Sequence, residues 1–82
     1  MLNATEAKRL ADTTAGPIIQ EELEKINKCI KRAAAKGEYC CVYECRRCYD
    51  IREEIAYRLK HNYGYRAYAN NLYPEINIMW KQ

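Results

Sequence analysis

The sequence predicts an α+β fold of two N-terminal helices followed by a strand, a helix and two strands, with a small three-stranded mixed sheet and the helices on one face. Three observations predict it. Apolar residues recur every three or four positions over residues 19–33 and 51–59, which is helical spacing. Alternation over residues 38–45 and 75–80 is typical of strands. A glycine stands at each expected helix end.

The first helix is predicted for residues 4–13. Asn3 and Glu6 have the spacing of a capping box, which satisfies free N–H groups at a helix start. Gly16 and Pro17 follow, and Pro is tolerated mainly in the first turn of a helix, so we expect a break and a new start there. The expected organisation is a helical arm at residues 1–15 beside a single α+β domain at residues 16–82.

The second helix is predicted for residues 17–36, with Gly37 as its stop. Its large apolar residues share one face, while Lys25, Lys28, Arg32 and Lys36 lie together on the far side. The apolar face can pack on the chain's own sheet or on a second copy. The arm has few large apolar residues, so it must also pack against another part of the chain or a second copy. The candidate oligomer interface is therefore Leu10, Ile19, Leu23, Ile26 and Ile30.

Asp50 and Glu53 have the spacing of a second capping box, and Gly64 stands where the following helix should end. We expect the first strand and the next one to be parallel, joined by a right-handed crossover, and the last two strands to form an antiparallel hairpin. The remaining elements are expected at residues 38–45 (strand), 51–63 (helix), 65–69 (strand) and 75–80 (strand).

Charge and composition exclude several functions. The chain has a net charge of +3, and residues 25–82 carry twelve Lys and Arg against six Asp and Glu, so the main body should attract anions. With three glycines there is no Gly-rich phosphate loop, and no Ser/His/Asp set is present, so we expect no enzyme. Apolar runs are too short for a membrane span, and the charges in residues 1–12 argue against a signal peptide.

The five cysteines allow three interpretations. Cys45 and Cys48 form a CxxC pair whose arginine neighbours would favour the thiolate of a redox motif. A zinc site is a weak alternative that would use Cys40, Cys45, Cys48 and His61. The favoured interpretation is that the cysteines are small apolar residues, because the count is odd and a second CxxC is missing. No cofactor is expected.

Arginine and tyrosine alternate between residues 46 and 68. Arginine forks bind phosphate, and tyrosine rings stack on bases. The candidate anion-binding residues are Arg46, Arg47, Arg52, Arg66, Tyr49, Tyr65 and Tyr68. The alternative is that these arginines only pair with neighbouring acids such as Glu44, Glu53 and Glu54.

Three segments together resemble a group of small bacteriophage proteins over residues 20–80: Ala33–Tyr39, Ile55–Leu59 with Gly64 and Tyr65, and Ile76–Trp80. The CxxC pair departs from that pattern. The resemblance implies a host-takeover or anti-defence factor that acts by binding in the cytoplasm of the infected bacterium. The arginines and tyrosines suggest that it binds an anionic nucleotide-type signal or an acidic host protein, and the helix that lacks a partner suggests a homo-oligomer. The alternative is a minor structural or assembly component of the virion. General nucleic-acid binding is not favoured, because the net charge is modest.

Overall fold

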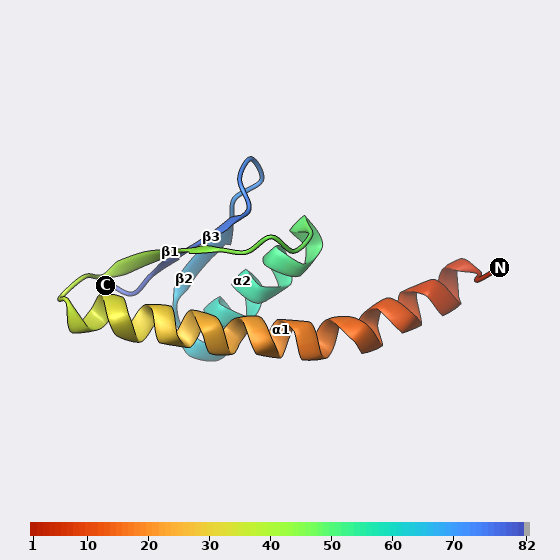
Figure 1. The fold of residues 1–82 in the computed structure, drawn as a ribbon, viewed down its shortest axis with the longest axis horizontal. Helices are drawn as coiled ribbons and strands as arrows, with labels where there is room; N and C mark the ends of the chain where they lie inside the picture. The colour runs from red at the N-terminus through yellow and green to blue at the C-terminus, as the bar shows by residue number, and fades with distance from the viewer. Residues whose placement is uncertain (82) are drawn as a thin grey trace.

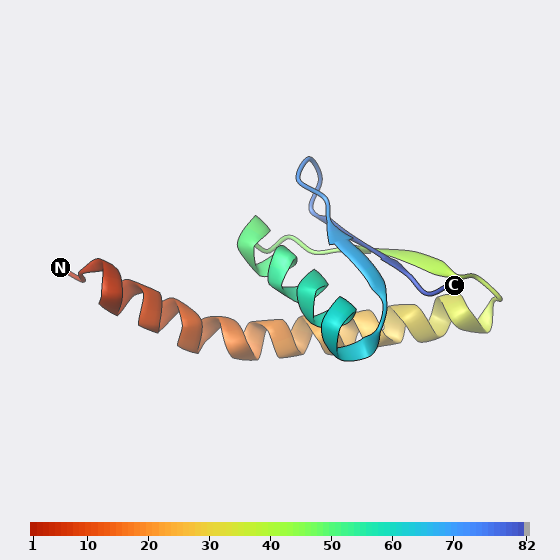
Figure 2. The same ribbon diagram turned by 180° about the vertical axis from the view of Figure 1, so that it is seen from behind.

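The computed structural model describes residues 1–81 and confirms an α+β fold with a small sheet. Two helices and three strands follow one another along the chain, and α1 runs the full length of the molecule beneath α2 and the sheet (Figures 1 and 2). Their bounds are α1 Ala4–Ala35, β1 Cys40–Glu44, α2 Tyr49–Tyr63, β2 Arg66–Ala69 and β3 Glu75–Met79.

The two predicted N-terminal helices are one continuous helix, so the expected break at residues 16–17 is wrong. Pro17 lies inside α1, and its start is capped as predicted, with the Asn3 side chain accepting the Glu6 N–H. Proline removes only one bond from the helix ladder. Good helix formers such as Ala, Lys, Arg and Leu precede it, and buried residues from Ile19 onward fix the direction after it. The helix therefore continues through the proline.

The sheet is antiparallel throughout, so the predicted mixed sheet with a parallel crossover pair is wrong. Its order is β1-β3-β2, and β3 pairs antiparallel with both neighbours. The hairpin of β2 and β3 is confirmed, but β3 also separates β1 from β2. Ile76 and Ile78 of β3 are completely buried, whereas β1 and β2 hold fewer buried residues. The most apolar strand therefore takes the central place, where burial is deepest.

The core lies between the two helices and one face of the sheet. Alternate strand residues point into it, as the two-residue period of a strand requires. Trp80 packs against the edge of the core, with its ring at 80° to that of Tyr65. The buried cluster consists of Ile19, Ile26 and Ile30 of α1, Ile55, Ala56 and Leu59 of α2, and Cys45, Ala67, Ile76 and Ile78.

Both predicted glycine stops are confirmed, but the second capping box is not. Gly37 and Gly64 have φ values of +80° and +78°, the left-handed conformation that ends a helix. The residue before α2 is Cys48, whose carbonyl accepts the first backbone bonds, and no side chain in the described part of the chain caps this end. Asp50 instead lies within the first turn, where its charge suits the helix dipole. Neither helix of residues 1–81 is long and apolar enough to cross a membrane.

Candidate binding site at the edge of the sheet

Three of the four arginines of the predicted anion site already have partners. Arg46 pairs with Glu44 at 2.6 Å and Arg47 with Glu22 at 3.3 Å. Arg52 donates to the carbonyl oxygens of Arg47 and Asn70, and so ties the loop before α2 to the loop before β3. The pairing of Arg46 with Glu44 agrees with the alternative interpretation of these arginines.

The tyrosines of that predicted site are divided between two places, since Tyr49 and Tyr68 line one groove and Tyr65 lines another pocket. The Arg52 guanidinium lies over the Tyr49 ring, 5.6 Å from its centroid. Tyr65 lines a pocket between the helices, and Tyr68 lines a groove beside β2. Arg66 stands at the start of β2 opposite Met79, and it makes no ion pair within residues 1–81. The structure does not bring the seven residues into one pocket.

Glu22 is a buried carboxylate that the sequence interpretation missed. It is 5% exposed, accepts the Tyr43 hydroxyl, and faces the Arg47 guanidinium, so it connects α1 with β1 and the loop that follows. Burial, and then the bond to Glu22, raise the pKa of the Tyr43 phenol. Helical spacing in the sequence could have indicated the burial of Glu22, because this residue lies three positions after Ile19 and four before Ile26, on the apolar face.

The cysteines lack the features of a redox or metal site. Cys45 is buried, and burial raises the pKa of its thiol, whereas a reactive first cysteine of a CxxC pair needs a lowered pKa. Burial and the neighbouring Cys29 raise the pKa of Cys41 to about 12. Within residues 1–81, no three potential ligands gather for a metal ion, so Cys40, Cys45, Cys48 and His61 are not assembled.

Most of the predicted oligomer interface faces inward. Ile19, Ile26 and Ile30 belong to the chain's own core, and Leu23 is half-buried against it. Only Leu10, on the projecting arm, is freely exposed. Residues 1–14 are all exposed, and Figure 1 shows this part of α1 reaching beyond the rest of the molecule.

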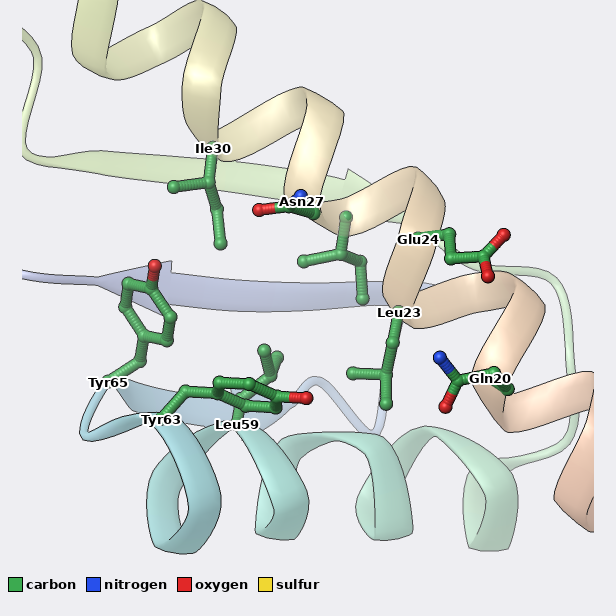
Figure 3. Close-up of a pocket in the computed structure, with 9 residues that line it drawn as sticks. Gln20, Leu23, Glu24, Asn27, Ile30, Leu59, Tyr63 and Tyr65 are labelled. Atoms are coloured by element: carbon green, nitrogen blue, oxygen red, sulfur yellow. The ribbon is translucent and has the colours of Figure 1, made fainter.

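A small pocket opens between α1 and the end of α2. Its volume is about 230 Å³, and Leu23, Ile30 and Leu59 form its apolar side. The Tyr65 ring points toward Ile30 of α1, and the Tyr63 ring extends along α2 beside Leu59 (Figure 3). Its only charged side chain is a carboxylate, Glu24, so the pocket does not suit an anion.

A stronger candidate is the free edge of β1. The Trp80 N–H bonds to the Tyr39 carbonyl at 3.0 Å, and the Cys45 N–H bonds to the Pro74 carbonyl at 2.7 Å. Hydrogen-bonding groups of an antiparallel strand alternate between its two sides. The odd-numbered residues of this strand therefore face β3, and Cys40, Val42 and Glu44 direct their N–H and C=O groups to the outside.

A basic groove runs along this free edge. It has a volume of about 400 Å³ and lies between β1 and the face of α1 that holds Lys25, Lys28 and Arg32. Lys25 pairs with Glu21 at 3.4 Å, while Lys28 and Arg32 make no ion pair in the described part of the chain. The edge thus offers backbone hydrogen bonds beside a row of positive charge. The other lining residues are Cys29, Val42, Tyr43 and Glu44.

Comparison with known proteins adds no family to this picture. No protein-family model, curated protein or solved structure matches the chain. The resemblance to small bacteriophage proteins therefore stays a prediction. The candidate site is argued from its own geometry and charge.

Proposed function

We propose that the protein is a non-catalytic bacteriophage factor that acts by binding, in host takeover or anti-defence, and that its partner is an acidic protein segment bound at β1. The observation that carries the proposal is the free edge of β1 beside Lys28 and Arg32. The phage context is supported by the sequence pattern of residues 20–80. The action would take place in the cytoplasm of the infected bacterium.

The edge favours an extended segment. An added strand can pair with the outward N–H and C=O groups of Cys40, Val42 and Glu44, as in recognition by β-strand addition. Val42 is 55% exposed, so it offers apolar contact to alternate side chains of the partner. The lysines and Arg32 then select acidic side chains that point toward α1.

The arginines and tyrosines of the predicted anion site do not favour a nucleotide as the ligand. Arg46 and Arg47 are each held by a carboxylate, which would repel a phosphate group. Of the tyrosines that would stack on a base, Tyr49 and Tyr68 line one groove whose charged residues are mostly carboxylates, and Tyr65 lines a different pocket. A protein partner therefore fits the geometry better than the nucleotide-type signal that the sequence alone also allowed.

The test is a binding titration with a labelled acidic peptide of alternating Glu and Val, followed by fluorescence anisotropy. We expect the double variant K28E/R32E to bind about tenfold more weakly, because two attractive charges become repulsive. The matched control is R9E/K31E, which makes the same change in net charge outside the groove and should bind as the unaltered protein does.

Two results would overturn the proposal. One is equal peptide affinity for the groove variant and the control variant. The other is the absence of peptide binding together with tight binding of a cyclic dinucleotide that Arg47→Glu abolishes, which would restore the nucleotide interpretation.

One observation favours the alternative of a virion component. The N-terminal part of α1 projects from the rest of the molecule and exposes Leu2 and Leu10, as a segment that docks on a neighbouring protein would. A virion component should enter assembled particles, and Leu10→Glu should prevent this while leaving peptide binding at β1 unchanged.

A further inference from the structure

The second edge of the sheet, formed by β2, also pairs with no further strand of residues 1–81. The Asn70 N–H bonds to the Glu75 carbonyl at 2.9 Å, so the even-numbered residues of this strand face β3. Ala67 and Ala69 therefore direct their N–H and C=O groups outward. Figure 2 shows α2 alongside β2, while β1 lies above α1.

A groove of about 410 Å³ follows this second edge, and its charge is opposite to that of the first. Its charged residues are Asp50, Glu53, Glu54 and Lys60, all on α2. Glu54 pairs with Arg58 at 3.2 Å. The neighbouring Glu53 carboxylate raises the pKa of the Tyr49 phenol, as an acidic surrounding does. The tyrosines and alanines of the lining are Tyr49, Tyr57, Tyr68, Ala56, Ala67 and Ala69.

The topology limits how two copies can join their edges while all helices stay on one face of a continuous sheet. A twofold rotation about the sheet normal joins like edges, β1 to β1 or β2 to β2, with antiparallel strands. Such contacts bring Lys28 and Arg32 against themselves, or Glu53 and Glu54 against themselves, and like charges repel.

The other arrangement joins unlike edges. β1 and β2 both run antiparallel to β3, so they share one direction, and β2 of one copy can continue into β1 of the next as a parallel pair. The α1 face with Lys28 and Arg32 then meets the α2 face with Glu53. Unlike edges are thus matched both in strand direction and in charge.

We propose that copies of this chain assemble head to tail, with the β2 edge of one copy on the β1 edge of the next. The inference rests on the proposed function, because it names a second copy as an acidic partner of the β1 edge. The exposed Val42, Tyr57 and Tyr68, each more than half exposed, would gain cover in this contact. A head-to-tail contact builds a ring if its rotation closes and a filament if it does not.

The test uses charge reversal on each edge separately, followed by sedimentation velocity at low and high salt. The unaltered protein should form oligomers that high salt disperses, because the contact depends on screened charges. The variants K28E/R32E and E53K/E54K should each be monomeric, since each has two edges of one sign. Lys31 lies outside both grooves, and Lys31→Glu should assemble normally.

Mixing the two reversed variants supplies the decisive result. Every edge then has an opposite edge on the other variant, so the mixture should regain assembly in alternating order. A mixture that stays monomeric while both variants give native circular dichroism spectra would overturn the head-to-tail contact. So would an unaltered protein that is monomeric at high micromolar concentration.

The two proposals fail in different ways. A monomeric protein that still binds the acidic peptide at β1 retains the proposed function and loses the head-to-tail contact. A protein that assembles through the mixed variants but ignores the peptide retains the contact and loses the proposed function.

Discussion

Glu22 shows at the scale of one residue how a carboxylate can hold this small fold together. Its oxygens accept from Tyr43 and face Arg47, so three separate parts of the chain meet at one buried group. A buried charge is costly without partners, and here both oxygens have one. The position of Glu22 on the apolar face can be predicted from helical spacing. Its partners cannot, because they lie 21 and 25 residues away in the sequence.

Replacing Glu22 should be costly. We expect Glu22→Ala to lower the free energy of unfolding by about 2 kcal/mol, because it leaves the Tyr43 hydroxyl without its acceptor and Arg47 without its counter-ion. Urea denaturation measures this change. Glu24→Ala is the matched control on the same helix and should change stability by less than about 0.5 kcal/mol. Equal losses for the two variants would contradict the role of Glu22.

The Tyr43 phenol predicts a dependence of stability on alkaline pH. Its pKa in the folded chain is raised above the ordinary value of 10.0, so the folded state keeps this proton when the unfolded state loses it. The contribution of Tyr43 is therefore complete below pH 10 and declines as the pH rises above that value. The stability difference between the unaltered protein and Tyr43→Phe, measured by urea denaturation, should shrink above pH 10. A difference that grows there would contradict the shift.

At the scale of the elements, Gly16 and Gly64 differ in their backbone conformation. One lies inside a helix and the other ends one. Gly64 ends α2 with φ +78°, whereas Gly16 lies within α1, and an added Cβ would meet no atom within 4 Å at either position. A steric clash therefore does not decide the effect of a larger residue at either position. Only the backbone conformation differs.

This difference predicts substitutions of opposite sign. Gly64→Ala should destabilise the fold by about 1 kcal/mol, because an L residue is strained at positive φ. Gly16→Ala should stabilise it by about 0.5–1 kcal/mol, because alanine favours a helix interior. Thermal and urea unfolding of the two single variants check both values. Two changes of the same sign would mean that one of these backbone conformations is wrong.

The elements themselves are largely predictable from the sequence, but their arrangement is not. Periodicity and the stops at Gly37 and Gly64 predicted the helix ends and three strands, because these signals are local. Local rules failed at Pro17, where packing from Ile19 onward keeps one continuous helix across a residue that usually breaks one. They also failed for strand order, since no local feature shows that β3 lies between the other strands.

The candidate site became visible only at the scale of the whole molecule. Lys25, Lys28 and Arg32 were predicted to share one side of their helix, and that is all the sequence can say. They form a groove only because β1 lies against α1 with its outer edge free. The opposite groove arises in the same way from α2 and β2. Two edges of opposite charge are therefore a property of the topology.

The central place of β3 also governs when this protein can fold. β1 and β2 pair only with β3 and not with each other. Neither strand therefore has a partner until the chain has been translated through residue 79. The contacts of β1 with β3 join residues 31 to 39 positions apart, and such distant pairings form slowly. While the ribosome is still making residues 75–79, the nascent chain can form α1 and α2 but no sheet. Loss of β3 would therefore remove both ladders at once, whereas loss of β1 or β2 would remove only one.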